Sequence, residues 1–141
     1  MKKNLVTISF LIALFLSSCG ILPITSKSGL NGTAWTLTSY DETVLLPGTN
    51  MTAFFDEGGV NGSASCNHYF GSINTKGDQI QIEGLGWTEM ACMDPEGIME
   101  QEQQVMNLFS QASSFSIQGR VLQITTESGE VLEFQQIENR K

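Results

Sequence analysis

Apolar and polar residues alternate along several short segments of this chain, and this pattern most restricts the folds open to it. Residues 33–40, TAWTLTSY, place Trp35 and Leu37 on one face and threonines on the other. The further residues expected to point inward are Met51, Ala53, Phe55, Ile80, Ile82, Phe115, Ile117, Leu122, Ile124, Leu132 and Phe134. Alternation of this kind is typical of antiparallel strands with one wet face. Glycine-containing turns at 57–59, 76–78, 119–120 and 128–129 separate the segments.

One segment, residues 94–112, departs from the period of two. It begins with Asp94, a good N-cap, and Pro95 suits the first helical position. One helical face then carries Ile98, Val105, Phe109 and Ala112. Because a single amphipathic helix must bury this face on the sheet, the sequence predicts an α+β fold. We expect a curved antiparallel sheet, or a partly open β-barrel, packed against one α-helix.

Glu102 lies on the apolar face of this predicted helix, four residues after Ile98 and three before Val105. A buried carboxylate is costly unless it accepts hydrogen bonds. We therefore expect a polar clamp between helix and sheet, with backbone or hydroxyl donors such as that of Thr88. A catalytic carboxylate, or a side chain that reaches water at the rim of the helix, is the alternative.

The first residues carry an export signal. Two lysines precede an apolar run over residues 5–16 that is too short to span a bilayer comfortably, and small residues then lead to Cys19. The ending LSSC resembles the bacterial lipobox, in which cleavage leaves the cysteine first and lipidated. We expect a lipoprotein signal peptide over residues 1–18 and lipidation at Cys19. A plain secretory peptide with an incidental cysteine is the alternative.

Acyl chains on Cys19 would anchor the chain in a membrane, at about 0.8 kcal/mol per buried methylene. Gly20 follows the cysteine in place of Asp, which by resemblance to the Gram-negative sorting rule favours the outer membrane, facing the periplasm. Residues 19–32 contain Pro, Ser and Gly without periodicity, so a lipidated N-terminus and flexible tether are expected there. The folded domain is expected over residues 33–137.

The chain is acidic, with 7 Lys and Arg residues against 15 Asp and Glu residues and a net charge of −8. Phosphate binding needs a basic face, so this charge argues against nucleic acid as a partner. It also argues against simple electrostatic attachment to anionic lipid. The length of 141 residues is enough for one domain and not for two.

Residues 60–73, VNGSASCNHYFGSI, set Cys66, Asn67 and His68 side by side. These residue types serve as nucleophile, orienter and base in cysteine hydrolases. In those enzymes the catalytic residues come from distant positions in the chain. Adjacent side chains of a strand point to opposite faces, so Asn67 cannot converge on one substrate with either neighbour, and Cys66 would have to use His68, two residues away on the same face. The chain has one histidine, and no second base is available. We expect no catalytic residues and no enzymatic activity.

A structural zinc site needs four Cys or His ligands. With Cys19 lipidated, the chain offers Cys66, Cys92 and His68, without CxxC spacing. We therefore expect no metal site and no cofactor.

The count of three cysteines, less one lipid anchor, leaves Cys66 and Cys92, and export places them where disulfides persist. A bond across these 26 positions would stabilise the fold by about 3–4 kcal/mol in the loop-closure model. Since Cys92 comes just before the predicted helix, the bond would pin the start of the helix to the sheet. Two unpaired buried thiols are the alternative.

Several separated motifs resemble, in this order, the META domain, also called the HslJ-like family, of bacterial lipoproteins. They are Trp35-x-Leu37, Asn61-Gly62, Cys66-Asn67-x-Tyr69 with Gly71, Thr88-x-Met90-Ala91-Cys92, and Glu102 in the following helix. The match runs from about residue 33 to residue 134. Ser65 stands where the family commonly has Gly, which leaves the local turn open. The resemblance makes Trp35, Gly62, Asn67, Tyr69, Gly71, Thr88, Met90 and Glu102 structural motif residues.

The resemblance implies a compact α+β domain in which a curved antiparallel sheet cradles a helix, with no established enzymatic activity. Members are linked to heat stress, to novobiocin resistance, or to secretion and motility, and the fold has been likened to lipid-binding pilot proteins. We therefore expect a non-catalytic, membrane-anchored envelope lipoprotein that acts in envelope stress response or binds an envelope protein.

A barrel that binds a small apolar ligand or lipid is the alternative function. Soft side chains that could line its mouth are Met51, Phe54, Phe55, Met90, Met93, Met99 and Met106. Plain core packing accounts for the same residues. Trp87 either packs against the expected disulfide or forms an exposed aromatic at a binding edge.

Overall fold

The computed structural model describes residues 29–138. These residues form nine strands and one helix. The elements are β1 (Thr33–Tyr40), β2 (Thr43–Val44), β3 (Thr52–Asp56), β4 (Gly59–Ser63), β5 (His68–Lys76), β6 (Gln79–Trp87), α1 (Ile98–Ser110), β7 (Ala112–Gln118), β8 (Val121–Thr126) and β9 (Val131–Gln136). The expected α+β composition, with an antiparallel sheet and one helix, is confirmed.

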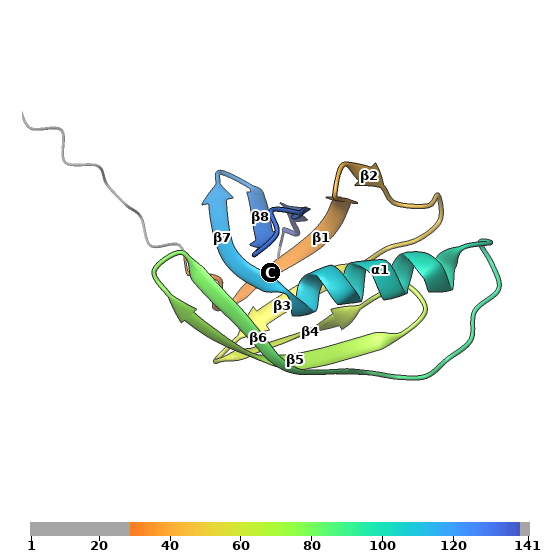
Figure 1. Cartoon of the computed structure of the whole chain (residues 1–141), viewed down its shortest axis with the longest axis horizontal. Helices are drawn as coiled ribbons and strands as arrows, with labels where there is room; N and C mark the ends of the chain where they lie inside the picture. Colours follow the sequence, from red (N-terminus) through yellow and green to blue (C-terminus); the bar gives the residue numbers. More distant parts are fainter. Residues whose placement is uncertain (1–28, 139–141) are drawn as a thin grey trace, which may run out of the picture.

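Eight of the nine described strands close into an antiparallel barrel, drawn in Figure 1. The strand order is β2-β1-β3-β4-β5-β6-β7-β8-β9, and β9 pairs back onto β1. Strand β2 stands outside the ring and pairs only with the end of β1. The sequence left a partly open barrel or curved sheet as the expectation. The ring is closed instead, because β1 pairs with β3 on one side and with β9 on the other.

The strand pairing of the ring is shortest between β6 and β7. Within the described chain, Gln79 and Ser114 form the one register pair between these strands, whereas β5 and β6 pair along nearly their whole length. Helix α1 follows β6 in the chain and precedes β7 (Figure 1), and it packs against β6, β8 and β9. The helix therefore fills the space where β6 and β7 diverge.

The barrel interior holds the alternating residues that the sequence places inward. Trp35, Phe55, Leu122, Ile124 and Leu132 are almost completely buried, while Phe115 and Ile117 are only partly buried. Helix α1 adds Val105, Met106 and Phe109 to this core. The cavity left between the helix and the barrel wall has a volume of about 10 Å³, enough for one water molecule at most.

Helix α1 begins at Ile98, four residues after the predicted N-cap at Asp94. Gly97 occupies the N-cap position with a φ of 86°, a left-handed conformation that cannot continue the helix upstream. Asp94 and Pro95 belong instead to residues 88–97, which connect β6 to α1 without regular secondary structure. At the other end, Ala112 is buried as predicted but lies at the start of β7.

The folded part extends upstream of residue 33. Leu30 is buried in the core, and the backbone N–H of Gly32 donates to the carbonyl oxygen of Phe55 at 2.8 Å. The expected signal peptide over residues 1–18, Cys19 and most of the expected tether over residues 19–32 lie outside the described residues. Within residues 29–138, no helix has the length and apolar character needed to cross a membrane.

Opposite Gly62, side-chain hydroxyl groups take part in the hydrogen bonds between β3 and its neighbours. The Tyr69 hydroxyl donates to the Thr52 carbonyl oxygen at 2.8 Å, and the Thr52 hydroxyl accepts the N–H of Ser63 at 3.1 Å. A Cβ atom on Gly62 would lie 1.9 Å from that carbonyl oxygen. Burial raises the pKa of Tyr69 far above its ordinary value of 10, so the phenol stays protonated and donates. The close approach of β3 therefore requires glycine at position 62.

We expect Gly62→Ala to lower the free energy of unfolding by about 3 kcal/mol, because the new Cβ would collide with backbone atoms rather than with a flexible side chain. Gly29→Ala is the matched control, since a Cβ there meets no atom within 4 Å. Urea unfolding followed by tryptophan fluorescence measures both variants. Equal stabilities for the two would refute the close approach as the reason for Gly62.

Candidate functional site

The carboxylate of Glu102 links α1 to the turn between β4 and β5. The side chain is 4% exposed, and its Oε2 accepts the backbone N–H groups of Cys66 at 3.2 Å and Asn67 at 2.9 Å. Its Oε1 accepts the side-chain amide of Asn67. Three N–H donors on one carboxylate compensate for its removal from water. The polar clamp expected between helix and sheet is therefore present.

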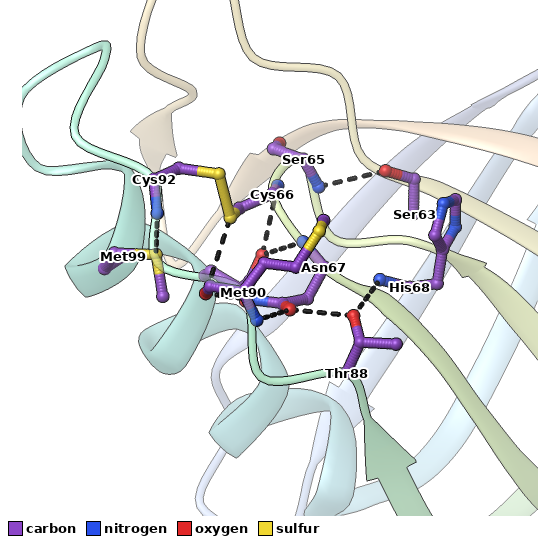
Figure 2. Close-up of a disulfide and its surroundings, with 10 residues drawn as sticks. Ser63, Ser65, Cys66, Asn67, His68, Thr88, Met90, Cys92 and Met99 are labelled. Carbon is purple, nitrogen blue, oxygen red and sulfur yellow. Dashed lines mark hydrogen bonds between the residues drawn. A yellow bond between two sulfur atoms is a disulfide. The ribbon is translucent and has the colours of Figure 1, made fainter.

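The side chain of Asn67 extends this network to the segment that follows β6. Its Oδ1 accepts the Thr88 hydroxyl at 2.8 Å and the Met90 N–H at 2.7 Å, and its Nδ2 donates to the Met90 carbonyl oxygen at 3.2 Å (Figure 2). Thr88 also accepts the N–H of His68 at 3.1 Å. Thr88 was considered as a donor to Glu102 and does not donate to it, because its hydroxyl donates to Asn67 Oδ1 instead.

Cys66 and Cys92 form a disulfide, as the cysteine count predicts (Figure 2). Their Cα atoms are 5.9 Å apart. The bond joins the β4–β5 turn to the segment of residues 88–97. Cys92 lies six residues before α1, so the bond does not reach the first turn directly as expected. The link to the helix passes through the Cys92 N–H, which donates to Met99 Sδ at 3.4 Å.

Cys66 and Asn67 lie in the β4–β5 turn, and only His68 belongs to a strand. The strand geometry used to separate these side chains was therefore wrong: the side chains of Cys66 and Asn67 both lie against the Met90 carbonyl oxygen, and His68 alone is set apart. Cys66 and Asn67 are buried and their N–H groups face Glu102, whereas His68 is exposed. Figure 2 shows the His68 ring turned away from Cys66. Among residues 29–138, no group of three His, Cys, Asp or Glu side chains is placed to hold a metal ion.

A second buried polar side chain, Gln101, was not predicted from the sequence. Its Oε1 accepts the N–H of Leu46 at 2.6 Å and its Nε2 donates to the Thr49 hydroxyl at 3.1 Å. Gln101 therefore fixes the loop between β2 and β3 against α1, beside the contact that Glu102 makes with the β4–β5 turn. A sequence signal for this was available, because Gln101 is adjacent to Glu102 and lies between the apolar Ile98 and Val105 of the same helix.

An open groove, called here the α1–β6 groove, runs between the helix and the end of β6. It consists of two adjoining hollows of about 800 and 340 Å³ that share Trp87, Glu100, Gln103 and Met106. The larger is also lined by Ile82, Gly84, Leu85, Gln104, Asn107 and Ser110. The smaller continues to Asn67, Thr88, Glu89, Met90, Met99 and Glu102. The buried network thus forms one end of an accessible groove.

A β-bulge at Gly84 directs Trp87 into this groove. Between Phe70 and Gly86 on one side and Ser72 and Glu83 on the other, β6 contains one residue more than β5. Gly84 adopts a φ of 61°, which glycine tolerates and other residues rarely adopt. Beyond Gly84, the positions whose side chains share the face of Ile80 and Ile82 are therefore displaced by one residue in the sequence. Trp87 is 49% exposed, so of the two alternatives the exposed aromatic is observed.

The family model for the META domain matches residues 28–139. The chain belongs to the META domain family. Its fold is similar to an NMR structure of a protein from Burkholderia xenovorans, with a TM-score of 0.66 and 26% identity over 78% of this chain and 85% of that one. A comparison with curated proteins finds no match.

Two more distant structures share the fold alone. One is a second NMR structure, with a TM-score of 0.61 and 18% identity over 75% of this chain and 90% of that one. The other is the crystal structure of a DUF4847 family protein from Bacteroides vulgatus ATCC 8482, with a TM-score of 0.58 and 10% identity over 79% of this chain and 96% of that one.

The motif residues of this META domain fall into two groups. Trp35, Gly62, Tyr69 and Gly71 belong to the barrel wall and core, where the Trp35 indole donates to the Thr33 hydroxyl at 2.7 Å. Asn67, Thr88, Met90 and Glu102 form the network. Met90 takes part through its backbone, and half of its side chain is exposed at the groove.

The methionine and aromatic residues considered for a ligand-binding mouth do not form one lining in the META domain. Met51, Phe55 and Met106 are buried in the core. Phe54 and Met90 are about half exposed and Met93 is 92% exposed. Met99 is partly buried against the smaller hollow. Core packing therefore accounts for only part of this set.

We expect Glu102→Gln to lower the free energy of unfolding by about 2–4 kcal/mol, because an amide group would replace one carboxylate oxygen and face N–H donors. Glu100→Gln is the matched control, an exposed glutamate one half-turn earlier, and should change stability by less than about 0.5 kcal/mol. Urea unfolding of the oxidised protein measures both. If the two variants are equally stable, the network does not hold α1 in place.

Ser65→Gly should raise the free energy of unfolding by about 1 kcal/mol, as measured by urea unfolding. Ser65 has a φ of 92°, and its buried hydroxyl oxygen has no hydrogen-bond partner. Glycine removes both costs. Its greater conformational freedom in the unfolded chain offsets part of the resulting gain in stability. Ser72→Gly, in the regular part of β5, should be destabilising by about 0.5–1 kcal/mol. A shift of the same sign in both variants would mean that the backbone and hydroxyl of Ser65 carry no such cost.

Proposed function

We propose that this chain is a non-catalytic envelope lipoprotein whose META domain binds a protein partner in the α1–β6 groove and thereby serves the envelope under stress. The anchor is an acyl group on Cys19, which places the domain at the periplasmic face of the outer membrane. The lipobox resemblance supports the anchor, and the membership in the META domain family supports the domain assignment.

Trp87 is the observation that carries partner binding. A half-exposed indole lies in a groove whose edges are a strand and a helix, beside Leu85 and Met90. Tryptophan is enriched among the residues that dominate binding energy at protein interfaces. The disulfide and the Asn67–Glu102 network hold the backbone at one end of the groove. Such preorganisation lowers the cost of ordering a binding surface.

The filled interior of the barrel argues against the alternative of an apolar-ligand or lipid-binding barrel. The cavity between α1 and the wall has a volume of about 10 Å³, far below that of an acyl chain. The α1–β6 groove is larger but open, and opposite the apolar Leu85 and Trp87 it is lined by polar side chains of the helix. These are Glu100, Gln103, Gln104, Asn107 and Ser110. A lining of this kind suits a polypeptide better than a hydrocarbon chain.

A non-catalytic role is supported by the state of the reactive residues. Cys66 is held in the disulfide, and His68, the one histidine of the chain, is exposed and turned away from it. Both oxygens of Glu102 already accept N–H groups of the domain itself. None of the three is arranged with a partner for nucleophilic or acid–base catalysis.

Site-specific photocrosslinking in intact cells tests the proposal. A benzophenone amino acid at Gln103, exposed on the helix side of the groove, should give one discrete protein adduct with the full-length chain. The adduct should fall severalfold when Trp87 is replaced by alanine, because the central anchor is lost.

The same amino acid at Gln118, exposed at the end of β7 away from the groove, is the positional control. Identical adducts from both positions, or none from Gln103, would sink the proposal. In the same cells, Cys19→Ser should release the protein from the membrane fraction and reduce the adduct if the partner is held at the membrane.

A further inference from the structure

We infer that the segment which fits the α1–β6 groove is a basic peptide in extended conformation that adds a strand to the free edge of β6. The inference rests on the proposed function and specifies the chemistry of the partner. Three features of the described chain carry it: the charge of the groove, the edge of β6, and the side chains beside that edge.

The groove carries negative charge without basic side chains. All 15 Asp and Glu residues of the chain lie within residues 29–138, where the basic residues are Lys76 and Arg120. Lys76 ends β5, and Arg120 lies in the β7–β8 turn beside Glu138. Neither lines the groove, whereas Glu89 and Glu100 do. The potential there favours a cationic partner and disfavours an acidic one.

The edge of β6 is open beside the groove. Beyond the single pair of Gln79 with Ser114, β6 has a strand neighbour on the β5 side only, among the residues described. Both Gly84 and Leu85, which are adjacent in sequence, line the larger hollow. Ile82 and Trp87 line the same hollow, so it runs along the part of β6 that has no partner on the β7 side. Backbone groups at such an edge can pair with an added strand.

Side chains beside this edge match a strand of alternating basic and apolar residues. Leu85 and Trp87 offer accessible apolar surface, and the exposed carboxylate of Glu100 stands on the helix opposite β6. Trp87 lies at the junction of the two hollows. A cation over the face of its indole is attracted by the ring, and Glu100 lines the same hollows. Alternation along the peptide would direct its charged and apolar side chains to different surfaces of the groove.

Fluorescence anisotropy with designed peptides tests the inference on the full oxidised chain in neutral detergent. The probe is a fluorescein-labelled octapeptide of alternating Lys and Val, and its acidic match alternates Glu and Val. We expect the Lys-Val peptide to bind about 10-fold tighter, and to weaken as salt is raised. Methylation of alternate backbone nitrogens keeps the charge but removes strand pairing, and should weaken binding about 10-fold.

Paired charge variants locate the site. Glu89→Gln with Glu100→Gln should weaken Lys-Val binding about 3- to 10-fold. Glu57→Gln with Glu127→Gln makes the same change in net charge at exposed positions outside the groove and should leave affinity unchanged. Equal loss in both pairs, equal binding of the two peptides, or no effect of N-methylation overturns the inference. If Gln103 gives specific crosslinks in cells but the purified chain does not prefer the Lys-Val peptide, the proposed function stands and the inference is refuted.

Discussion

The carboxylate of Glu102 is the interaction on which the arrangement of this domain depends. It accepts two backbone N–H groups of the β4–β5 turn and the amide of Asn67, and so fixes α1 to the barrel by groups that cannot reach water. A buried helix carboxylate without these donors would be strongly unfavourable. The β4–β5 turn has two buried N–H groups that need an acceptor. Each side of the contact therefore requires the other, which specifies one seating of the helix where β6 and β7 part.

The groove is a consequence of this seating. Helix α1 lies where β6 and β7 part, and the edge of β6 that lacks a β7 partner borders the groove beside the helix. The bulge at Gly84 then brings Leu85 and Trp87 to that edge. The same helix buries Val105 and Phe109 while exposing Glu100 and Gln103, so it contributes to the core on one side and to the groove on the other.

Much of the fold could be predicted from local pattern alone. Strand alternation identifies inward residues such as Trp35 and Leu122 because it is a short-range rule, and counting identifies the disulfide because two cysteines remain once Cys19 is set aside. Closure of the ring could not be predicted, since it depends on the long-range pairing of β1 with β9. The helix start was misplaced because Asp94 is a good cap in isolation, while Gly97 adopts a left-handed conformation in the fold. Trp87 was left undecided because one extra residue at Gly84 reverses the side-chain direction.

Residues 88–97 connect the disulfide to the α1–β6 groove. Asn67 holds the start of this segment through Thr88 and Met90, and the disulfide holds Cys92, whose N–H in turn meets Met99 of α1. The segment lacks regular secondary structure, so these side-chain and disulfide contacts determine its path along the smaller hollow. A compartment that maintains the disulfide therefore preserves the shape of the groove as well as the stability of the barrel. In a reducing compartment the hydrogen bonds of Asn67, His68 and Met99 would have to position that segment without the covalent link.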